Sequence, residues 1–277
     1  MSKVRSIAVL VPYFGKLPWY FHFFLHSCKY NPTIDFYIIS DSKEIKGIPA
    51  NVKVIYKTLE EVNILASNKL GFQTNIKNGY KLCDIKPAYG FIFSDLIKGY
   101  DFWGQSDVDI ILGDLMSFFD TTFLNSYDYV GVRHDFPTGF FFLFRNNDLM
   151  NTLFMRSKDY KKVFSDEKHY CFDECNNVHS ELTAGKSIFK LKTEIESFMH
   201  IIKDAEMRNG LRLHLDFICI EGTSGNIKFD KGKLFYKNRY EAILYHLIAF
   251  KRFGKSSIKN RTIPDKYNIS SSRIYYR

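Results

Sequence analysis

The chain has 277 residues, of which 45% are hydrophobic and 25% charged, so it is long enough for one large globular domain or two small ones. Its formal net charge of +9 favours polyanionic partners such as nucleic acid, anionic lipid or a phosphorylated small molecule, without choosing among them. No apolar run approaches the roughly 20 residues of a membrane span, and the five scattered cysteines indicate reduced thiols, so we expect a cytoplasmic protein.

Short apolar runs rich in β-branched residues predict buried strands, and longer runs without a breaker predict helices. In chain order these patterns give strand 6–14, helix 19–30, strand 34–42, strand 52–58, helix 58–71, helix 86–97, and strands 100–106, 127–134 and 139–146. The helix from Thr58 has the clearest bounds, because Glu61 completes a capping box and Gly71 is a typical stop. This alternation predicts an α/β fold with a mainly parallel, doubly wound sheet, in which ligands bind beyond the carboxyl ends of the strands.

The second half of the chain is less regular. Two alternating runs around Asp-Lys-Gly predict a hairpin over Asn226–Asn238, followed by a basic, apolar-faced helix or strand–helix over residues 240–253. From about Ser256 the chain is polar and basic, and we expect a tail that lies over the surface or is partly disordered. We therefore predict a single domain of residues 1–255 and a basic C-terminal tail of residues 256–277.

Three aspartates follow one another closely in the stretch from Phe102 to Leu115. Asp107 and Asp109, two residues apart in an extended segment, present their carboxylates to the same side. Two carboxylates at such a short distance raise each other's pKa unless a cation lies between them. Mg²⁺ and Mn²⁺ are cations that prefer oxygen ligands. We therefore predict a metal site; the alternative is that Asp107 caps a turn and Asp109 pairs with a surface lysine. Asp114 is assigned to a helix start.

The stretch YDFWGQSDVDIILGDL resembles the Asp-x-Asp segment of nucleotide-sugar glycosyltransferases with the GT-A fold, especially small bacterial transferases of surface-polysaccharide loci. Further motifs follow in the family's order: PYFG (12–15), SD (40–41), CDIKPAYG (83–90), TGFFFLFRNN (138–147), CFDE (171–174) and YHLIAFK (245–251). The resemblance covers about residues 6–251. It implies a Rossmann-like GT-A domain with a nucleotide-binding half, residues 1–115, and an acceptor half, residues 116–255.

The resemblance also implies a donor site built around Mn²⁺ or Mg²⁺. Asp107 would face the ribose or the metal, and Asp109 would ligate the metal. His246 is the candidate for a late histidine ligand of this family, with a core or interface histidine as the alternative. Lys251 would reach the diphosphate as a fixed positive charge. Lys86, before a helix start, suits an anionic ligand; the alternative is a solvated lysine.

The nucleotide itself would lie against the loop that follows the first strand. Pro12 opens this loop, and Tyr13 or Phe14 would lie against the base. Gly15 either permits close approach of the backbone or is a plain turn residue. Asp41, at the end of the second strand, would bond the base or the ribose.

Asp173 and Glu174 are the candidates for the base that deprotonates the acceptor hydroxyl. Inverting members of the fold place an Asp or Glu beyond the metal motif, and such a base needs a pKa near the working pH. We favour Asp173. The alternative is that both are acids at a helix start.

A competing pattern lies in the same segment. Four potential zinc ligands occur within eleven residues: His169, Cys171, Cys175 and His179. Their spacings differ from those of a compact zinc knuckle, although three of them would share one face of a helix. Zinc bound by these four residues would displace the catalytic interpretation of Asp173 and Glu174.

We therefore expect an inverting, metal-dependent transferase of bacterial surface-polysaccharide synthesis. It would move a sugar from a nucleotide-diphosphate sugar, with UDP favoured, to a hydroxyl of a glycan or lipid-linked saccharide. The basic charge would hold it on the anionic inner face of the cytoplasmic membrane. Two alternatives are a basic nucleic-acid-binding protein, although no standard motif occurs, and a metal-dependent phosphatase or nucleotidyltransferase, although residues 104–106 separate the strand from Asp107.

Overall fold

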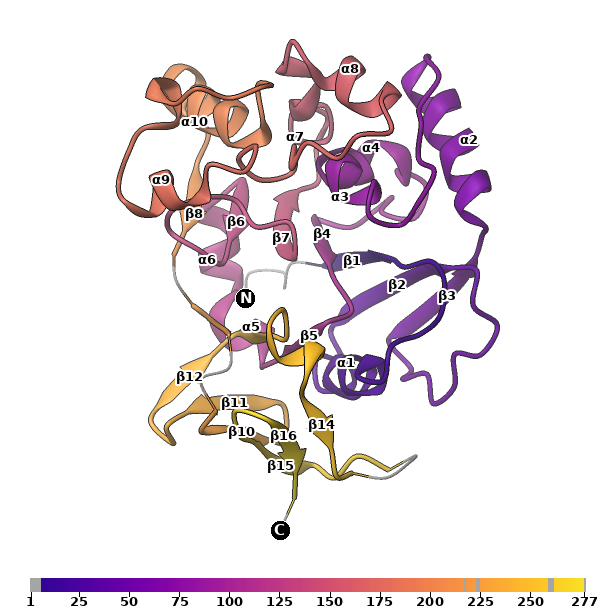
Figure 1. Ribbon diagram of the computed structural model, residues 1–277, viewed down its shortest axis with the longest axis vertical. Coiled ribbons are helices and arrows are strands. Elements are labelled where there is room, and N and C mark those ends of the chain that lie inside the picture. The colour runs from indigo at the N-terminus through magenta and orange to yellow at the C-terminus, as the bar shows by residue number, and fades with distance from the viewer. Residues whose placement is uncertain (1–5, 217, 223–224, 259–261, 277) are drawn as a thin grey trace.

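The computed structural model describes residues 6–216, 218–222, 225–258 and 262–276 (Figure 1). Its centre is a seven-stranded sheet. The strands, in spatial order, are β3 (Val52–Tyr56), β2 (Ile34–Ser40), β1 (Ile7–Pro12), β4 (Phe102–Ser106), β7 (Phe141–Arg145), β6 (Tyr129–Gly131) and β8 (Leu213–Leu215). All neighbouring pairs are parallel except those of β7, which runs antiparallel to both β4 and β6. The predicted α/β architecture with a mainly parallel central sheet is thus confirmed.

Helices cover both faces of this sheet, and β1 shows why. Its side chains alternate: Ile7, Val9 and Val11 pack with α1 (Phe21–Lys29). Ala8 and Leu10 instead join the core formed with α2 (Leu59–Leu70) and α4 (Tyr89–Ile92). Figure 1 shows α1 below the sheet and α2 and α4 above it. The unbroken apolar run of the first strand is therefore explained by burial on both faces.

The remaining helices are short except α10 (Phe198–Asn209), which is as long as α2. The others are α3 (Leu82–Ile85), η1 (Lys86–Ala88), α5 (Leu115–Phe118), α6 (Thr121–Ser126), α7 (Asp148–Asn151), η2 (Leu153–Arg156), α8 (Tyr160–Ser165), α9 (His179–Thr183), η3 (Ile188–Lys190) and η4 (Phe250–Arg252). The capping box of α2 forms as predicted, with Gly71 left-handed after its end. The predicted helix 86–97 is wrong in its bounds, because residues 86–88 form η1 and the α-helix that follows ends at Ile92.

A second sheet closes the lower part of the molecule (Figure 1). Its strands, in spatial order, are β12 (Tyr240–Ala242), β11 (Lys233–Tyr236), β10 (Ile227–Asp230), β15 (Lys266–Ile269), β16 (Arg273–Tyr275) and β14 (Lys255–Ser256). The predicted hairpin is confirmed, since β10 and β11 pair antiparallel. The expectation of a surface tail from residue 256 is wrong, because β15 pairs with β10 and its buried Tyr267 stacks on Phe229 at a ring distance of 4.7 Å.

A third, three-stranded sheet connects the two larger ones. It consists of β5 (Ile110–Leu112), β13 (Leu244–His246) and β9 (Cys219–Glu221). Residues 240–253 therefore form strands β12 and β13 and the single turn η4, rather than a helix or strand–helix. The apolar side chains of β13 are buried in this connection. The pairing of β13 with β5 brings this C-terminal part of the chain against the segment that follows Asp109.

Gly90 provides a test of the packing between α4 and the central sheet. A Cβ atom at this position would lie 2.3 Å from Cε2 of the fully buried Trp103. We expect Gly90→Ala to lower the free energy of unfolding by about 2 kcal/mol, because the rigid indole has to move. Urea unfolding measures this change. Gly79→Ala is the matched control, since its nearest neighbour would be 4.0 Å away; equal stability of the two variants would contradict the packing.

Candidate active site

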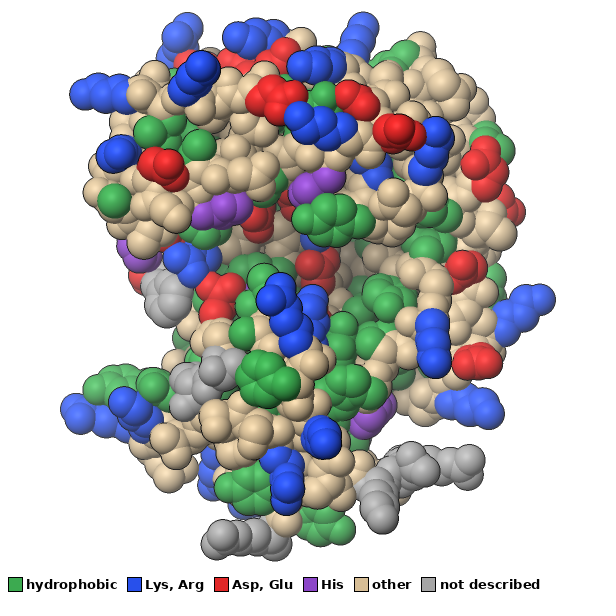
Figure 2. Space-filling model, in the orientation of Figure 1, with side chains coloured by type: hydrophobic (Ala, Val, Ile, Leu, Met, Phe, Trp, Pro, Cys, Tyr) green, Lys and Arg blue, Asp and Glu red, His purple; other side chains and the backbone are tan. Residues whose placement is uncertain are grey.

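Two adjoining cavities lie where β4 ends, with volumes of about 440 and 390 Å³. The smaller one, here called the loop-side cavity, includes Pro12, Tyr13 and Phe14 in its wall. The larger one, the acid-side cavity, includes Asp173 and Glu174. Six residues line both: Tyr80, Cys83, Lys86, Asp107, Asp109 and Lys251. Figure 2 shows this face hollowed in the middle of the molecule, with acidic, basic and histidine side chains around the hollow.

Asp107 is held at the end of β4 by contacts from three directions. Its backbone N–H donates to the Phe140 carbonyl at 2.9 Å. Lys86 Nζ lies 2.7 Å from its Oδ1, and Gln105 Nε2 donates to the same oxygen at 2.7 Å. Burial raises the pKa of Asp107, the charge of Lys86 opposes this, and Asp109 adds to it. Lys86 is only 5% exposed, so it is not the solvated lysine of the alternative interpretation.

Asp109 is buried and contacts two cations from the end of the chain. Lys251 Nζ donates to its Oδ2 at 2.5 Å, and His246 Nε2 lies 3.5 Å from the same oxygen. Burial alone would raise the pKa of Asp109, but the hydrogen bond and charge of His246 and the charge of Lys251 lower it below its usual range. The lysine that pairs with Asp109 is thus a residue of the cavity wall rather than a surface lysine.

His246 joins this pair to a further carboxylate. Its Nδ1 lies 3.1 Å from Glu221 Oε1, and its ring stacks on Phe140 at 4.1 Å. Burial lowers the pKa of His246, but the hydrogen bonds with Asp109 and Glu221 raise it to about 9. Asp107, Asp109 and His246 line one cavity without forming a compact ligand set. Among the described residues, the group of three whose ligand atoms lie within 4.8 Å of one another is Cys171, Glu174 and His179.

Asp173 is buried and Glu174 half-buried next to Gly139, and the two acids differ in their electrostatics. Burial, and next the charge of Glu174, raise the pKa of Asp173 well above its usual range. Burial also raises the pKa of Glu174, but hydrogen bonds from His179 and the Gly139 N–H lower it overall. A Cβ atom on Gly139 would lie 2.0 Å from Asp173 Oδ2, so any larger residue here would displace the Asp173 carboxyl group. Lys86 Nζ donates to the Gly139 carbonyl at 2.7 Å and thereby links this group to Asp107.

Some residues of the predicted nucleotide loop line the loop-side cavity, whereas others hold the turn in place. Pro12, Tyr13 and Phe14 line the loop-side cavity, whereas Gly15 and Asp41 line neither cavity. Gly15 has a φ of +95°, which favours glycine, and its N–H donates to Asp41 Oδ1 at 2.9 Å. The described contact of Asp41 therefore fixes the turn that carries Tyr13 and Phe14.

Two ionic residues of the site were missed in the sequence. Arg133 forms a two-pronged contact with Asp135 and also pairs with Glu221, which in turn contacts His246. Arg133 and Glu221 both line the acid-side cavity. Arg133 lies in a predicted strand just beyond β6, so the rule that ligands bind at strand ends would have marked it. Glu221 ends β9, a strand that the sequence analysis did not predict.

The four-residue zinc pattern does not assemble. His169 Nδ1 lies 3.3 Å from Asp84 instead, and Cys175 is fully buried in the core above the sheet. The segment is not a helix, since α9 begins only at His179. Cys171 and His179 do meet, but with Glu174 between them in place of the other two residues.

A family model described as "Family of unknown function (DUF6625)" matches residues 9–276. The chain belongs to this family. No curated protein matches it. Among solved structures, this DUF6625 chain is similar to one described as "crystal structure of a glycosyltransferase involved in the glycosylation of the major capsid of PBCV-1". The two sequences are 10% identical, the TM-score is 0.42, and the match covers 89% of this chain and 96% of that chain. A likeness this low carries no argument about activity. Within the described residues, no helix is long and apolar enough to cross a membrane.

The titration of His246 tests the ionic contacts of this DUF6625 site. We expect a midpoint near pH 9 instead of the usual 6.5, measured by NMR on the ring protons in metal-free buffer. Because the folded pKa is raised, the protonated ring stabilises the fold fully below pH 6.5, and this contribution is lost as the pH rises through about 9. Glu221→Gln should lower the midpoint, whereas His134→Asn, an exposed control, should not. A wild-type midpoint at or below 6.5 would contradict the contacts.

Proposed function

We propose that this chain is a metal-dependent glycosyltransferase of the GT-A type that uses a nucleotide-diphosphate sugar. One observation carries the proposal: the two cavities meet at Asp107 and Asp109, between Lys86 and Lys251. The loop-side cavity offers aromatic side chains against which a nucleobase would lie, and the acid-side cavity offers a buried carboxyl group that would take the proton of the acceptor hydroxyl. Sugar transfer needs the nucleotide and the acceptor on opposite sides of a group of residues that neutralises the charge of the leaving diphosphate.

The shared wall suits a diphosphate leaving group. Lys86 and Lys251 supply fixed positive charge, and Tyr13 and Phe14 supply the surface on which a base would lie. The contacts above engage Oδ1 of Asp107 and Oδ2 of Asp109, which supports the use of the opposite oxygens as ligands of Mn²⁺ or Mg²⁺. Such an ion, when bound, would neutralise the two phosphates as a Lewis acid.

His246 enters this proposal with a changed role. Both of its ring nitrogens face carboxylates, Asp109 and Glu221, and are thus already engaged. We therefore propose Asp107 and Asp109 as the metal ligands and His246 as a positioning residue that orients Asp109.

Asp173 is the proposed general base. Its pKa is raised, as a base that works near neutral pH requires, and its carboxyl group lies in the acid-side cavity. The acceptor hydroxyl would give its proton to Asp173 while its oxygen bonds to the anomeric carbon. The bond from that carbon to the diphosphate breaks, and the nucleoside diphosphate leaves with the electron pair. Attack from the acid side, with departure toward the loop side, favours inversion.

The finer parts of the proposal rest on the sequence resemblance and the charge. They are UDP as the nucleotide, a glycan or lipid-linked saccharide as the acceptor, and a role in bacterial surface-polysaccharide synthesis. The net charge of +9 supports contact with an anionic membrane surface.

Asp109→Asn tests the metal-dependent donor site. We expect transfer, or donor hydrolysis, with Mn²⁺ and a panel of nucleotide sugars to fall by about 100-fold or more, which corresponds to about 3 kcal/mol of transition-state stabilisation. The rise in melting temperature that UDP and Mn²⁺ together give the wild type should also disappear. Asp114→Asn, which alters the N-cap of α5, should keep both signals. Full activity of Asp109→Asn would refute the metal assignment.

Asp173→Asn tests the base. We expect kcat to fall by about 100- to 10,000-fold, with the thermal shift by UDP and Mn²⁺ retained, because the acid-side cavity holds the acceptor rather than the nucleotide. Asp95→Asn, at a largely exposed aspartate, is the control and should leave kcat unchanged. Unchanged kcat in Asp173→Asn would assign the base elsewhere.

A further inference from the structure

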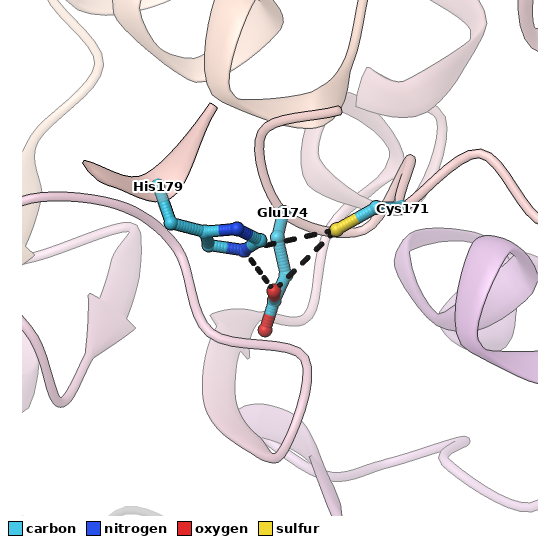
Figure 3. A group of neighbouring side chains, drawn as sticks. All are labelled: Cys171, Glu174 and His179. Atoms are coloured by element: carbon cyan, nitrogen blue, oxygen red, sulfur yellow. Dashed lines mark hydrogen bonds and ion pairs between the residues drawn. The ribbon is translucent and has the colours of Figure 1, made fainter. Parts of the chain in front are cut away.

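A cysteine, a glutamate and a histidine turn their ligand atoms toward one point in the wall of the acid-side cavity (Figure 3). Cys171 Sγ lies 3.5 Å from Glu174 Oε2 and 3.8 Å from His179 Nε2. His179 Nε2 lies 2.7 Å from Glu174 Oε2. The two distances to the sulfur are close to those between ligand atoms around one tetrahedral ion with bonds of roughly 2.0–2.3 Å. The shorter distance between His179 and Glu174 is that of a hydrogen bond, which an ion bound between them would lengthen.

The geometry does not fit a cysteine nucleophile with a histidine base. In such a triad one ring nitrogen faces the nucleophile and the other faces the carboxylate. Here the same nitrogen, Nε2 of His179, faces both Cys171 and Glu174. Three ligand atoms that converge on one point are instead typical of a metal site.

We infer that Cys171, Glu174 and His179 bind one Zn²⁺ ion. Thiolate, imidazole and carboxylate are the three ligand types that zinc takes in proteins, and a thiolate disfavours Mg²⁺ and Mn²⁺. The site is therefore chemically distinct from the all-oxygen pair Asp107 and Asp109. It does not depend on the proposed transfer reaction.

The surroundings hold these ligands in the required orientation. The Gly139 N–H donates to Glu174 Oε1 at 2.7 Å and leaves Oε2 toward the sulfur and the ring. Burial, and next the charges of Asp173 and Glu174, raise the pKa of the Cys171 thiol well above its usual range, and backbone N–H groups of Asn177 and Cys175 that hydrogen-bond its sulfur oppose this. A metal ion bound to the sulfur would hold it as the thiolate. Such outer contacts are a regular feature of metal sites, since they fix the ligands and adjust their charge.

Three protein ligands leave a fourth position. All three residues line the acid-side cavity, so this position faces the space that also contains Asp173. Sites with three protein ligands and an open position bind water or a substrate oxygen, whereas structural zinc sites have four protein ligands. The zinc would thus contribute to the acceptor side of the cavity, and Glu174 would serve as its ligand rather than as a second base.

The experiment uses tag-free protein freed of metal by a chelator and dialysed against Zn²⁺ alone. We expect about one zinc per chain, and with Co²⁺ in its place a sulfur-to-cobalt charge-transfer band in the near ultraviolet. Cys171→Ser should abolish the band, and Cys171→Ser and His179→Asn should each weaken zinc binding by at least about 100-fold, because loss of an outer partner alone costs roughly 10–100-fold. Circular dichroism checks that each variant is folded.

Matched controls separate this site from its neighbours. Cys83→Ser and His134→Asn should keep zinc affinity, since neither residue belongs to the cluster. Asp109→Asn should also keep it while losing the response to UDP and Mn²⁺, so failure of the zinc site and failure of the proposed transferase are distinguishable. Wild-type protein that binds no zinc, a cobalt complex without the sulfur band, or equal binding by the ligand variants would overturn the inference.

Discussion

The antiparallel pairing of β5 with β13 is the contact on which the rest of the site depends. It places His246 opposite Ile110, and the Leu247 N–H donates to the Asp109 carbonyl at 2.8 Å. Through it Lys251 reaches Asp109, 142 residues earlier in the chain. Without this pairing the aspartates would end β4 with no cation from the C-terminal part beside them.

Charge balance explains why so many ionisable groups can be buried together. Three carboxylates have a cation within reach: Lys86 for Asp107, Lys251 and His246 for Asp109, and Arg133 for Glu221. A fourth, Glu174, contacts the ring of His179. Burying a charge without a partner is costly, so these pairs keep the cavity walls in a defined state. Asp173 differs, since its neighbours are mostly acidic and its pKa is raised. This asymmetry sets Asp173 apart from the paired carboxylates.

Local patterns predicted most of the elements that surround the site. The capping box at Thr58, the stop at Gly71, and the hairpin of β10 and β11 follow from short-range geometry, and each was predicted with the right partners. The errors lie where contacts between distant segments determine the structure. The segment 240–253 was predicted as a helix or strand–helix, but it contains β13, which pairs with β5 and β9. The residues from 256 on were predicted as a surface tail, but Tyr267 packs on Phe229 and anchors them.

The sequence by itself determined most strands of the central sheet, the position of Asp107 and Asp109 at the end of one of them, and the loop that begins at Pro12, because strand periodicity and strand ends are local properties. Only the tertiary structure decided which cation meets which carboxylate, because that depends on strand register between distant segments. It also separated Asp173 from Glu174, neighbours in sequence whose pKa values shift in opposite directions. Their difference comes from Gly139 and His179, which hydrogen-bond Glu174 and which no pattern within residues 171–174 can supply.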